Sequence, residues 1–182
     1  MQIRKRLAAA EPDRADYQRD LSVSYNKLGD LQGALGQGEQ ALALYTQSLQ
    51  IRKRLAAAEP DRADYQRDLS VSYNKLGDLQ GALGQGEQAL ALYTQSLQIA
   101  QRLLELQPTS TVAAIDLAIL LVQISHYDPD PAARRREGRT ILVQLRNEDR
   151  LNAHGEQILA ELDSPLLAQR RPTTTDPRSP RR

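Results

Sequence analysis

Two histidines are the first residues whose type could carry chemistry. His126 and His154 are the only histidines among the 182 residues, and the chain has no cysteine. Neither histidine has a second His, a Cys or a close pair of acids at the spacing that binds a metal. We therefore expect both to be surface or cap residues, and we expect no metal site.

Two pairs of aspartates could in principle perform acid–base catalysis. Asp13 and Asp16 recur as Asp61 and Asp64, and each pair directly follows a proline. At the predicted start of a helix, Asp13 can cap free amides, and acidic residues favour the first turn. Capping accounts for both pairs, and we find no nucleophile–base arrangement. We therefore do not expect an enzyme, and we expect no cofactor.

A glycine cluster, Gly33, Gly36 and Gly38, superficially resembles a phosphate-binding loop. No Gly-Lys-Ser/Thr follows the cluster and no strand precedes it, so the phosphate-loop motif is incomplete. A tight turn between two helices explains the glycines better, since glycine adopts turn conformations readily.

The composition predicts an all-α protein. The chain is 40% hydrophobic and 26% charged, with no Phe, Trp or Cys, so Leu and Ala dominate its apolar residues. Both are strong helix formers, whereas residues that favour strands are few. The net charge of +1 makes no strong case for nucleic acid or an anionic membrane. We therefore interpret the basic run Arg134–Arg136 as solvent-exposed side chains rather than as a contact for nucleic acid.

Two further features bear on location. The most apolar segment, Val112–Ile124, is too short to cross a membrane and is predicted to be a buried helix. The lack of cysteine is typical of a reducing compartment, so we expect a cytoplasmic protein.

A long internal repeat dominates the chain. Residues 2–49 and 50–97 are identical over all 48 positions, and a third copy begins at Gln98 and then diverges, although Pro108 still falls 48 residues after Pro60. A fixed period between 20 and 50 residues indicates stacked supersecondary units rather than one closed globule.

Each repeat is predicted to form two antiparallel helices. Apolar residues recur every three or four positions along the first, as expected of one helix face: Tyr17, Leu21, Tyr25, Leu28, Leu31 and Leu35. The glycine cluster ends this helix, and a second runs from about Glu39 to the break at Pro60. Its inward residues are Ala41, Leu44, Tyr45, Ser48, Ile51 and Leu55.

These positions resemble the signature of the tetratricopeptide repeat (TPR) family. The matching residues are Tyr25, Leu28, Gly29, Gly36, Ala41, Tyr45 and Ser48, and again Tyr73, Leu76, Gly77, Gly84, Ala89, Tyr93 and Ser96. The resemblance implies a right-handed α-solenoid of antiparallel helix pairs, a TPR-like superhelix. A plain helical bundle is the alternative, but it would not require these glycines. The usual period is 34 residues, so this 48-residue repeat resembles the long-helix variety of bacterial multi-repeat proteins.

The predicted organisation has five parts. Residues 1–12 are a remnant of a preceding second helix, 13–60 and 61–108 are helix pairs, and 109–163 hold a degenerate third pair and a C-terminal helical cap. Two cap helices are expected at about Ala132–Asn147 and Asn152–Leu162. Residues 164–182, rich in Arg and Pro, are expected to form a disordered basic tail.

The incomplete first unit leaves two interpretations. Either the chain is a piece of a longer array, which we favour, or this end packs on another chain, because an uncapped solenoid end exposes apolar surface.

The resemblance implies that the first helices line a concave face that binds a peptide or protein. The polar stripe predicted for this face comprises Arg19, Asn26, Asp30, Arg67, Asn74 and Asp78. The negative charge of Asp30 and Asp78 argues against an acidic C-terminus as ligand and favours a basic or mixed peptide. The alternative for each residue is a solvated side chain without a ligand.

The sequence therefore predicts a protein–protein interaction module, a scaffold or an adaptor. The alternative is a detached sensor or regulatory arm of a larger multidomain signalling protein. Self-association through the open N-terminal end is a further hypothesis, whereas neither a membrane nor a nucleic acid is expected as partner.

Overall fold

The computed structural model describes residues 1–164, and in this part of the chain the regular structure is entirely α-helical. The expected tail lies outside the described residues, except for Ser164. The helices in chain order are α1 (Gln2–Ala10), α2 (Ala15–Ala34), α3 (Gly38–Ala58), α4 (Ala63–Ala82), α5 (Gly86–Leu106), α6 (Thr111–Ile124), α7 (Pro131–Asn147) and α8 (Ala153–Asp163).

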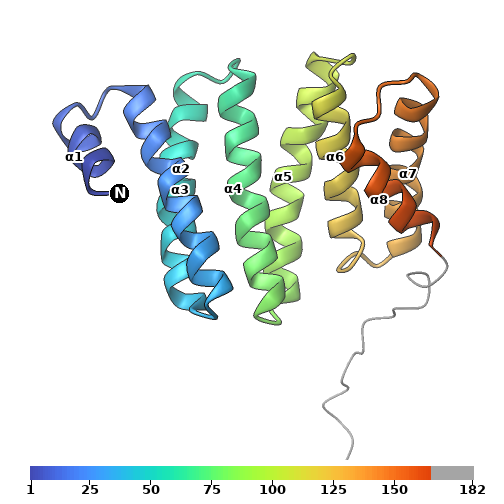
Figure 1. Ribbon diagram of the computed structural model, residues 1–182, viewed down its shortest axis with the longest axis horizontal. Coiled ribbons are helices and arrows are strands. Elements are labelled where there is room, and N and C mark those ends of the chain that lie inside the picture. The colour runs from blue at the N-terminus through green and yellow to red at the C-terminus, as the bar shows by residue number, and fades with distance from the viewer. Residues whose placement is uncertain (165–182) are drawn as a thin grey trace, which may run out of the picture.

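The helices stack side by side into one elongated row (Figure 1). Helices α2 and α3 form one antiparallel pair and α4 and α5 the next, followed by α6 and α7, with α8 crossing in front of them (Figure 1). In each of the first two pairs the first helix lies toward the viewer and the second behind it. The fold is therefore an α-solenoid of helix pairs.

The turn between α2 and α3 is formed by the glycine cluster, as predicted. Helix α2 ends at Ala34 and α3 begins at Gly38. Gly36 between them has a φ of +72°, in the left-handed region that glycine adopts without a steric penalty.

Gly29 allows close approach of the two helices in a pair. A Cβ built on this residue would lie 2.5 Å from Cε1 of Tyr45, so only glycine leaves room for that ring. Tyr45 is buried in turn, in a cluster with Ala41 and with Leu76 of the next repeat. The signature residues thus hold the two helices of a pair together and connect the pair to the next repeat.

The predicted cap at Asp13 is wrong. Helix α2 has Arg14 at its N-cap position, without a capping side chain, so Asp13 lies one residue too early to reach the free amides. Arg14 instead pairs with Asp16, its Nη2 lying 2.7 Å from Oδ2. Asp16 does lie in the first turn of α2, where the helix dipole stabilises a negative charge. Helix α4 repeats this start with Arg62 at the N-cap.

The C-terminal units begin with capped helices and enclose the most apolar core. Ser110, Asp130 and Asn152 accept hydrogen bonds from the first turns of α6, α7 and α8, respectively. Helix α6 is buried along most of its length, as its composition predicts, and α7 and α8 pack against it through Leu142 and Leu159. No helix in residues 1–164 is both long and apolar enough to cross a membrane.

The N-terminal end of the row is less covered than the middle. Helix α1 contributes Ala8 to a cluster with Leu21 and Tyr25 of α2, and it lies beside the upper half of α2 only (Figure 1). Leu28 of α2 is consequently half-buried, whereas its counterpart Leu76 in α4 is 5% exposed.

Candidate binding face

The two predicted arginines link consecutive first helices. Nε of Arg19 in α2 lies 2.5 Å from Oδ2 of Asp68 in α4, and Nε of Arg67 in α4 lies 2.6 Å from Oδ2 of Asp116 in α6. In both cases the hydrogen bond to the aspartate raises the pKa of the arginine, against the opposing effect of burial. Both arginines therefore connect neighbouring repeats.

The two predicted aspartates accept hydrogen bonds within and between repeats. Oδ1 of Asp30 accepts from the Tyr45 hydroxyl at 2.6 Å and from Nζ of Lys75 in α4, also at 2.6 Å. Oδ1 of Asp78 accepts from the Tyr93 hydroxyl at 2.7 Å. Burial, followed by these hydrogen bonds, raises the pKa of both tyrosines. Asp30 and Asp78 nevertheless remain exposed to solvent.

The two predicted asparagines are more enclosed than a solvated stripe would require. Asn26 is 6% exposed, and Asn74 is half-buried. Within residues 1–164, Oδ1 of each is buried without a hydrogen-bond partner. Unsatisfied buried oxygens of this kind are uncommon in folded proteins.

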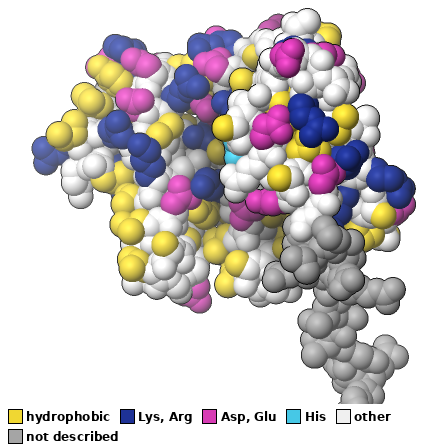
Figure 2. Space-filling model, turned by 45° about the vertical axis from the view of Figure 1, so that its right-hand side comes forward, with side chains coloured by type: hydrophobic (Ala, Val, Ile, Leu, Met, Phe, Trp, Pro, Cys, Tyr) yellow, Lys and Arg dark blue, Asp and Glu magenta, His cyan; other side chains and the backbone are white. Residues whose placement is uncertain are grey.

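The face carries an open depression between α2 and α4, which we call the α2–α4 depression. Its volume is about 440 Å³, and its lining residues are Asp30, Gly33, Ala34, Tyr45, Lys75, Asp78, Leu79 and Ala82. It brings together two of the predicted residues, Asp30 and Asp78, from different repeats. On the face of the molecule shown in Figure 2, acidic and basic side chains lie interspersed with hydrophobic ones.

The corresponding space between α4 and α6 is occupied by Tyr127. Its ring stacks on that of Tyr93, with centroids 5.8 Å apart, and its hydroxyl lies where a Cβ on Gly81 would be. Tyr127 stands 48 residues after Leu79. The α2–α4 depression is therefore open because the smaller leucine stands at this position.

Among the lining residues that were not predicted from the sequence are Lys75 and Leu79. The signal that could have identified them is the divergent third copy, in which Gln123 and Tyr127 replace them. Of these two replacements, Tyr127 fills the corresponding space between α4 and α6, while the helical fold is kept.

Neither histidine forms a hydrogen bond with the charged residues of this face among the described residues. Nδ1 of His126 contacts the backbone oxygen of Gln123 at 3.1 Å, and His154 is exposed. In the described part of the chain, no three His, Asp or Glu side chains lie close enough together to hold a metal ion.

Comparison with protein families gives a match to part of the chain. Residues 20–95, from within α2 to within α5, match the tetratricopeptide repeat, whereas no curated protein matches the chain. The matched residues contain the glycine turn, the Gly29–Tyr45 contact and the depression described above. Tetratricopeptide repeats are generally protein–protein interaction modules. Residues 20–95, less than half of the chain, are therefore similar to the tetratricopeptide repeat family.

Proposed function

We propose that this protein binds a basic or mixed peptide segment of a protein partner in the α2–α4 depression. The observation that carries the proposal is the open space of about 440 Å³ in which Asp30 and Asp78 both remain exposed. A scaffold or adaptor requires such a surface on a rigid array.

The charge of the depression favours a cationic group. Its lining contains two carboxylates, Asp30 and Asp78, against one ammonium, Lys75. The hydrogen bonds to each carboxylate from other described residues go to Oδ1. An ionised carboxylate accepts on both oxygens, so Oδ2 of each is available to a donor from a ligand.

The rest of the lining suits an aliphatic stem. Gly33, Ala34 and Ala82 are small, and Leu79 is apolar. Lys and Arg side chains combine an apolar stem with a cationic end. A peptide that carries one of them could pack the stem on these residues and donate to a carboxylate.

The test compares wild-type protein with the double variant Asp30→Asn, Asp78→Asn on an array of peptides. Asparagine retains an oxygen that accepts from the tyrosine hydroxyl, so the inter-helix hydrogen bond survives while the charge is lost. We expect the binding of basic peptides to weaken by roughly tenfold or more, because a hydrogen bond to a charged group contributes about 1.5–3 kcal/mol.

A matched control is Asp13→Asn, which removes an exposed carboxylate in the loop between α1 and α2. Circular dichroism should show that all variants fold. An unchanged binding profile in the folded double variant would overturn the proposal, as would an equal loss in Asp13→Asn. The alternative hypothesis of a regulatory arm of a larger signalling protein stays a prediction.

A further inference from the structure

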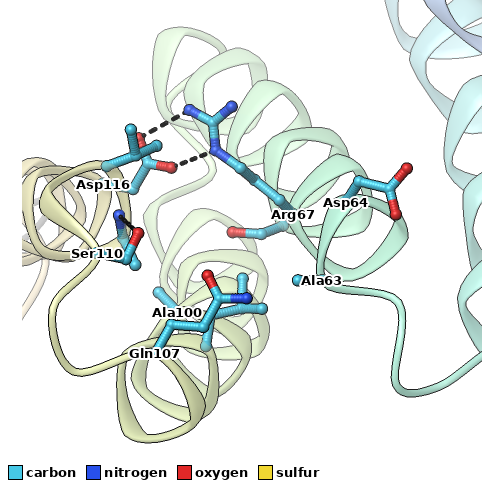
Figure 3. Close-up of a pocket in the computed structure, with 11 residues that line it drawn as sticks. Ala63, Asp64, Arg67, Ala100, Gln107, Ser110 and Asp116 are labelled. Atoms are coloured by element: carbon cyan, nitrogen blue, oxygen red, sulfur yellow. Dashed lines mark hydrogen bonds and ion pairs between the residues drawn. The ribbon is translucent and has the colours of Figure 1, made fainter.

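A second cavity lies between α4, α5 and α6, away from the α2–α4 depression. We call it the α4–α5–α6 cavity. Its volume is about 230 Å³, and its lining residues are Ala63, Asp64, Arg67, Ser70, Ala100, Leu103, Gln107, Ser110, Val112, Ala113 and Asp116. Figure 3 shows the Arg67–Asp116 ion pair along one side of the space and Gln107 and Ser110 along another.

The preceding repeat shows what occupies the equivalent place. Between α2, α3 and α4 lies the side chain of Arg52, which extends from α3; the residue is 4% exposed. Its Nε donates to Oγ of Ser22 at 3.1 Å, and its Nη1 donates to the backbone oxygen of Asp68 at 2.7 Å and to Oγ of Ser72 at 3.2 Å. The three helices therefore enclose a guanidinium-binding site that this protein fills itself.

Two substitutions empty this site in the next repeat. Ala100 stands 48 residues after Arg52, and Ala113 stands 48 residues after Tyr65. Both alanines line the α4–α5–α6 cavity, whereas Arg52 and Tyr65 are buried in the preceding repeat. The cavity therefore lies where a guanidinium and an aromatic ring are replaced by methyl groups.

Two of the three hydrogen-bond acceptors of Arg52 are retained, whereas the counterpart of Ser72 is Leu120. Ser70 and Asp116 are the counterparts of Ser22 and Asp68, and both line the cavity. Ser22 donates to the backbone oxygen of Arg19 and accepts from Arg52. Ser70 instead shares a hydrogen bond of 2.6 Å with Oγ of Ser96. Among the described residues no guanidinium donates to Ser70.

One ion pair beside the site is also retained. The Arg19–Asp68 pair lies beside Arg52, and the Arg67–Asp116 pair lies at the equivalent place beside the cavity. Burial is the main influence that lowers the pKa of Arg52, with Asp68 opposing it and Arg19 adding to it. A guanidinium in the cavity would therefore meet one arginine–aspartate pair as Arg52 does, whereas Val112 stands in place of Asp64, the second partner of Arg19.

We infer that the α4–α5–α6 cavity binds the side chain of an arginine residue presented by a polypeptide partner. The guanidinium would donate to Ser70 Oγ and to the backbone oxygen of Asp116, as Arg52 does to their counterparts. The space is several times the roughly 30 Å³ share of one water molecule, so a side chain can enter. This inference does not depend on the function proposed for the α2–α4 depression.

The test uses N-acetyl-arginine amide as a probe of the wild-type protein, with binding followed by calorimetry. The comparison ligand is the citrulline analogue, which has nearly the same shape but no charge and fewer donors. We expect saturable binding of the arginine probe and binding of the citrulline analogue weaker by about tenfold, because charge-assisted hydrogen bonds are roughly twice as strong as neutral ones.

Two variants fill the cavity from within. Ala100→Arg restores the counterpart of Arg52, and Ala113→Tyr restores that of Tyr65. We expect each folded variant to lose binding of the arginine probe and Ala100→Arg to melt at a higher temperature than the wild type. The second variant keeps the test decisive if the first does not fold.

A matched control creates the site elsewhere. Arg52→Ala, Tyr65→Ala introduces both alanines of the α4–α5–α6 cavity at the equivalent place between α2, α3 and α4, so we expect a lower melting temperature and a second binding site for the probe. The inference is overturned if Ala100→Arg and Ala113→Tyr still bind the probe, or if the citrulline analogue binds equally well. Free arginine binding much more tightly than the blocked probe would contradict a polypeptide as the source.

Discussion

Gly33 and Gly81 occupy the same position of two identical sequences, but their surroundings differ. A Cβ on Gly33 would have no neighbour closer than Cβ of Ala41 at 4.0 Å, whereas a Cβ on Gly81 would meet the hydroxyl of Tyr127. The third repeat therefore determines which glycine is structurally required.

We predict opposite effects for the two alanine substitutions. Gly33→Ala should raise the free energy of unfolding by about 0.5–1 kcal/mol, because alanine favours the helix more than glycine does. Gly81→Ala should lower it by about 1–3 kcal/mol, because Tyr127 must leave its place against Tyr93. Urea unfolding of both variants measures the difference. Equal effects would show that Tyr127 does not occupy the space beside Gly81.

The inter-helix tyrosines should make the fold sensitive to alkali. Burial and then the hydrogen bonds to Asp30 and Asp78 raise the pKa of Tyr45 and Tyr93. The folded protein therefore keeps protons that unfolded tyrosine, with a pKa of about 10, releases. Their contribution to stability is complete below about pH 10 and is lost as the pH rises further.

Urea unfolding at pH 8 and above pH 10 checks this pH dependence. We expect the free energy of unfolding to decline over that interval in the wild type and to decline less in Tyr45→Phe, Tyr93→Phe. The same decline in that double variant would assign the alkaline effect to other groups.

At the scale of the helix, the sequence predicts most of the fold because periodicity and glycine placement are local signals. The two cap helices were expected at Ala132–Asn147 and Asn152–Leu162 and lie at Pro131–Asn147 and Ala153–Asp163. The cap of α2 was predicted wrongly, since a shift of one residue decides whether Asp13 can reach an amide.

The candidate site is less accessible to sequence reasoning because it depends on contacts between repeats. The stripe that contains Asp30 and Asp78 follows from helix geometry, but their bonds to Tyr45 and Tyr93 require the folded pair. Burial of Arg52 requires three helices to meet. In the sequence, Arg52 is one of several charged residues on an amphipathic helix.

Helices α2 and α4 have identical sequences and therefore the same helix propensity. Any difference in stability between equivalent substitutions in them must come from packing. Leu76 of α4 is 5% exposed and packs with Ala41 and Tyr45, whereas Leu28 of α2 is half-buried. We predict that Leu76→Ala lowers the free energy of unfolding by about 2–5 kcal/mol and that Leu28→Ala costs less, about 1–2 kcal/mol. Chemical denaturation compares them. Equal costs would mean that α2 is covered as fully as α4.

At the scale of the whole molecule, the N-terminal end of the row exposes large apolar side chains. Ile3 is 74% exposed, and Leu31 is 52% exposed although its counterpart Leu79 is half-buried. Exposed apolar patches favour association. Self-association through this end therefore stays a prediction.

Sedimentation velocity over a range of concentrations tests this association. We expect the wild type to associate as its concentration rises and Ile3→Glu, Leu31→Glu to remain monomeric. The matched control is Leu106→Glu, at a side chain that is 63% exposed at the end of α5. If the control suppresses association equally, the N-terminal end is not the contact.

Binding of a basic peptide in the α2–α4 depression can be tested directly with a fluorescent label. Because the chain has no cysteine, a thiol introduced by Ala34→Cys at the edge of the depression can carry an environment-sensitive fluorophore. The same label placed by Ala160→Cys on the exposed side of α8 is the control.

Titration with the strongest basic peptide from the array gives the result. We expect a saturable change in fluorescence from the label at position 34 and none from the label at position 160, with the change lost after Asp30→Asn, Asp78→Asn. Saturable binding of that peptide that leaves the label at position 34 unchanged, or a response that survives the double substitution, would contradict the account.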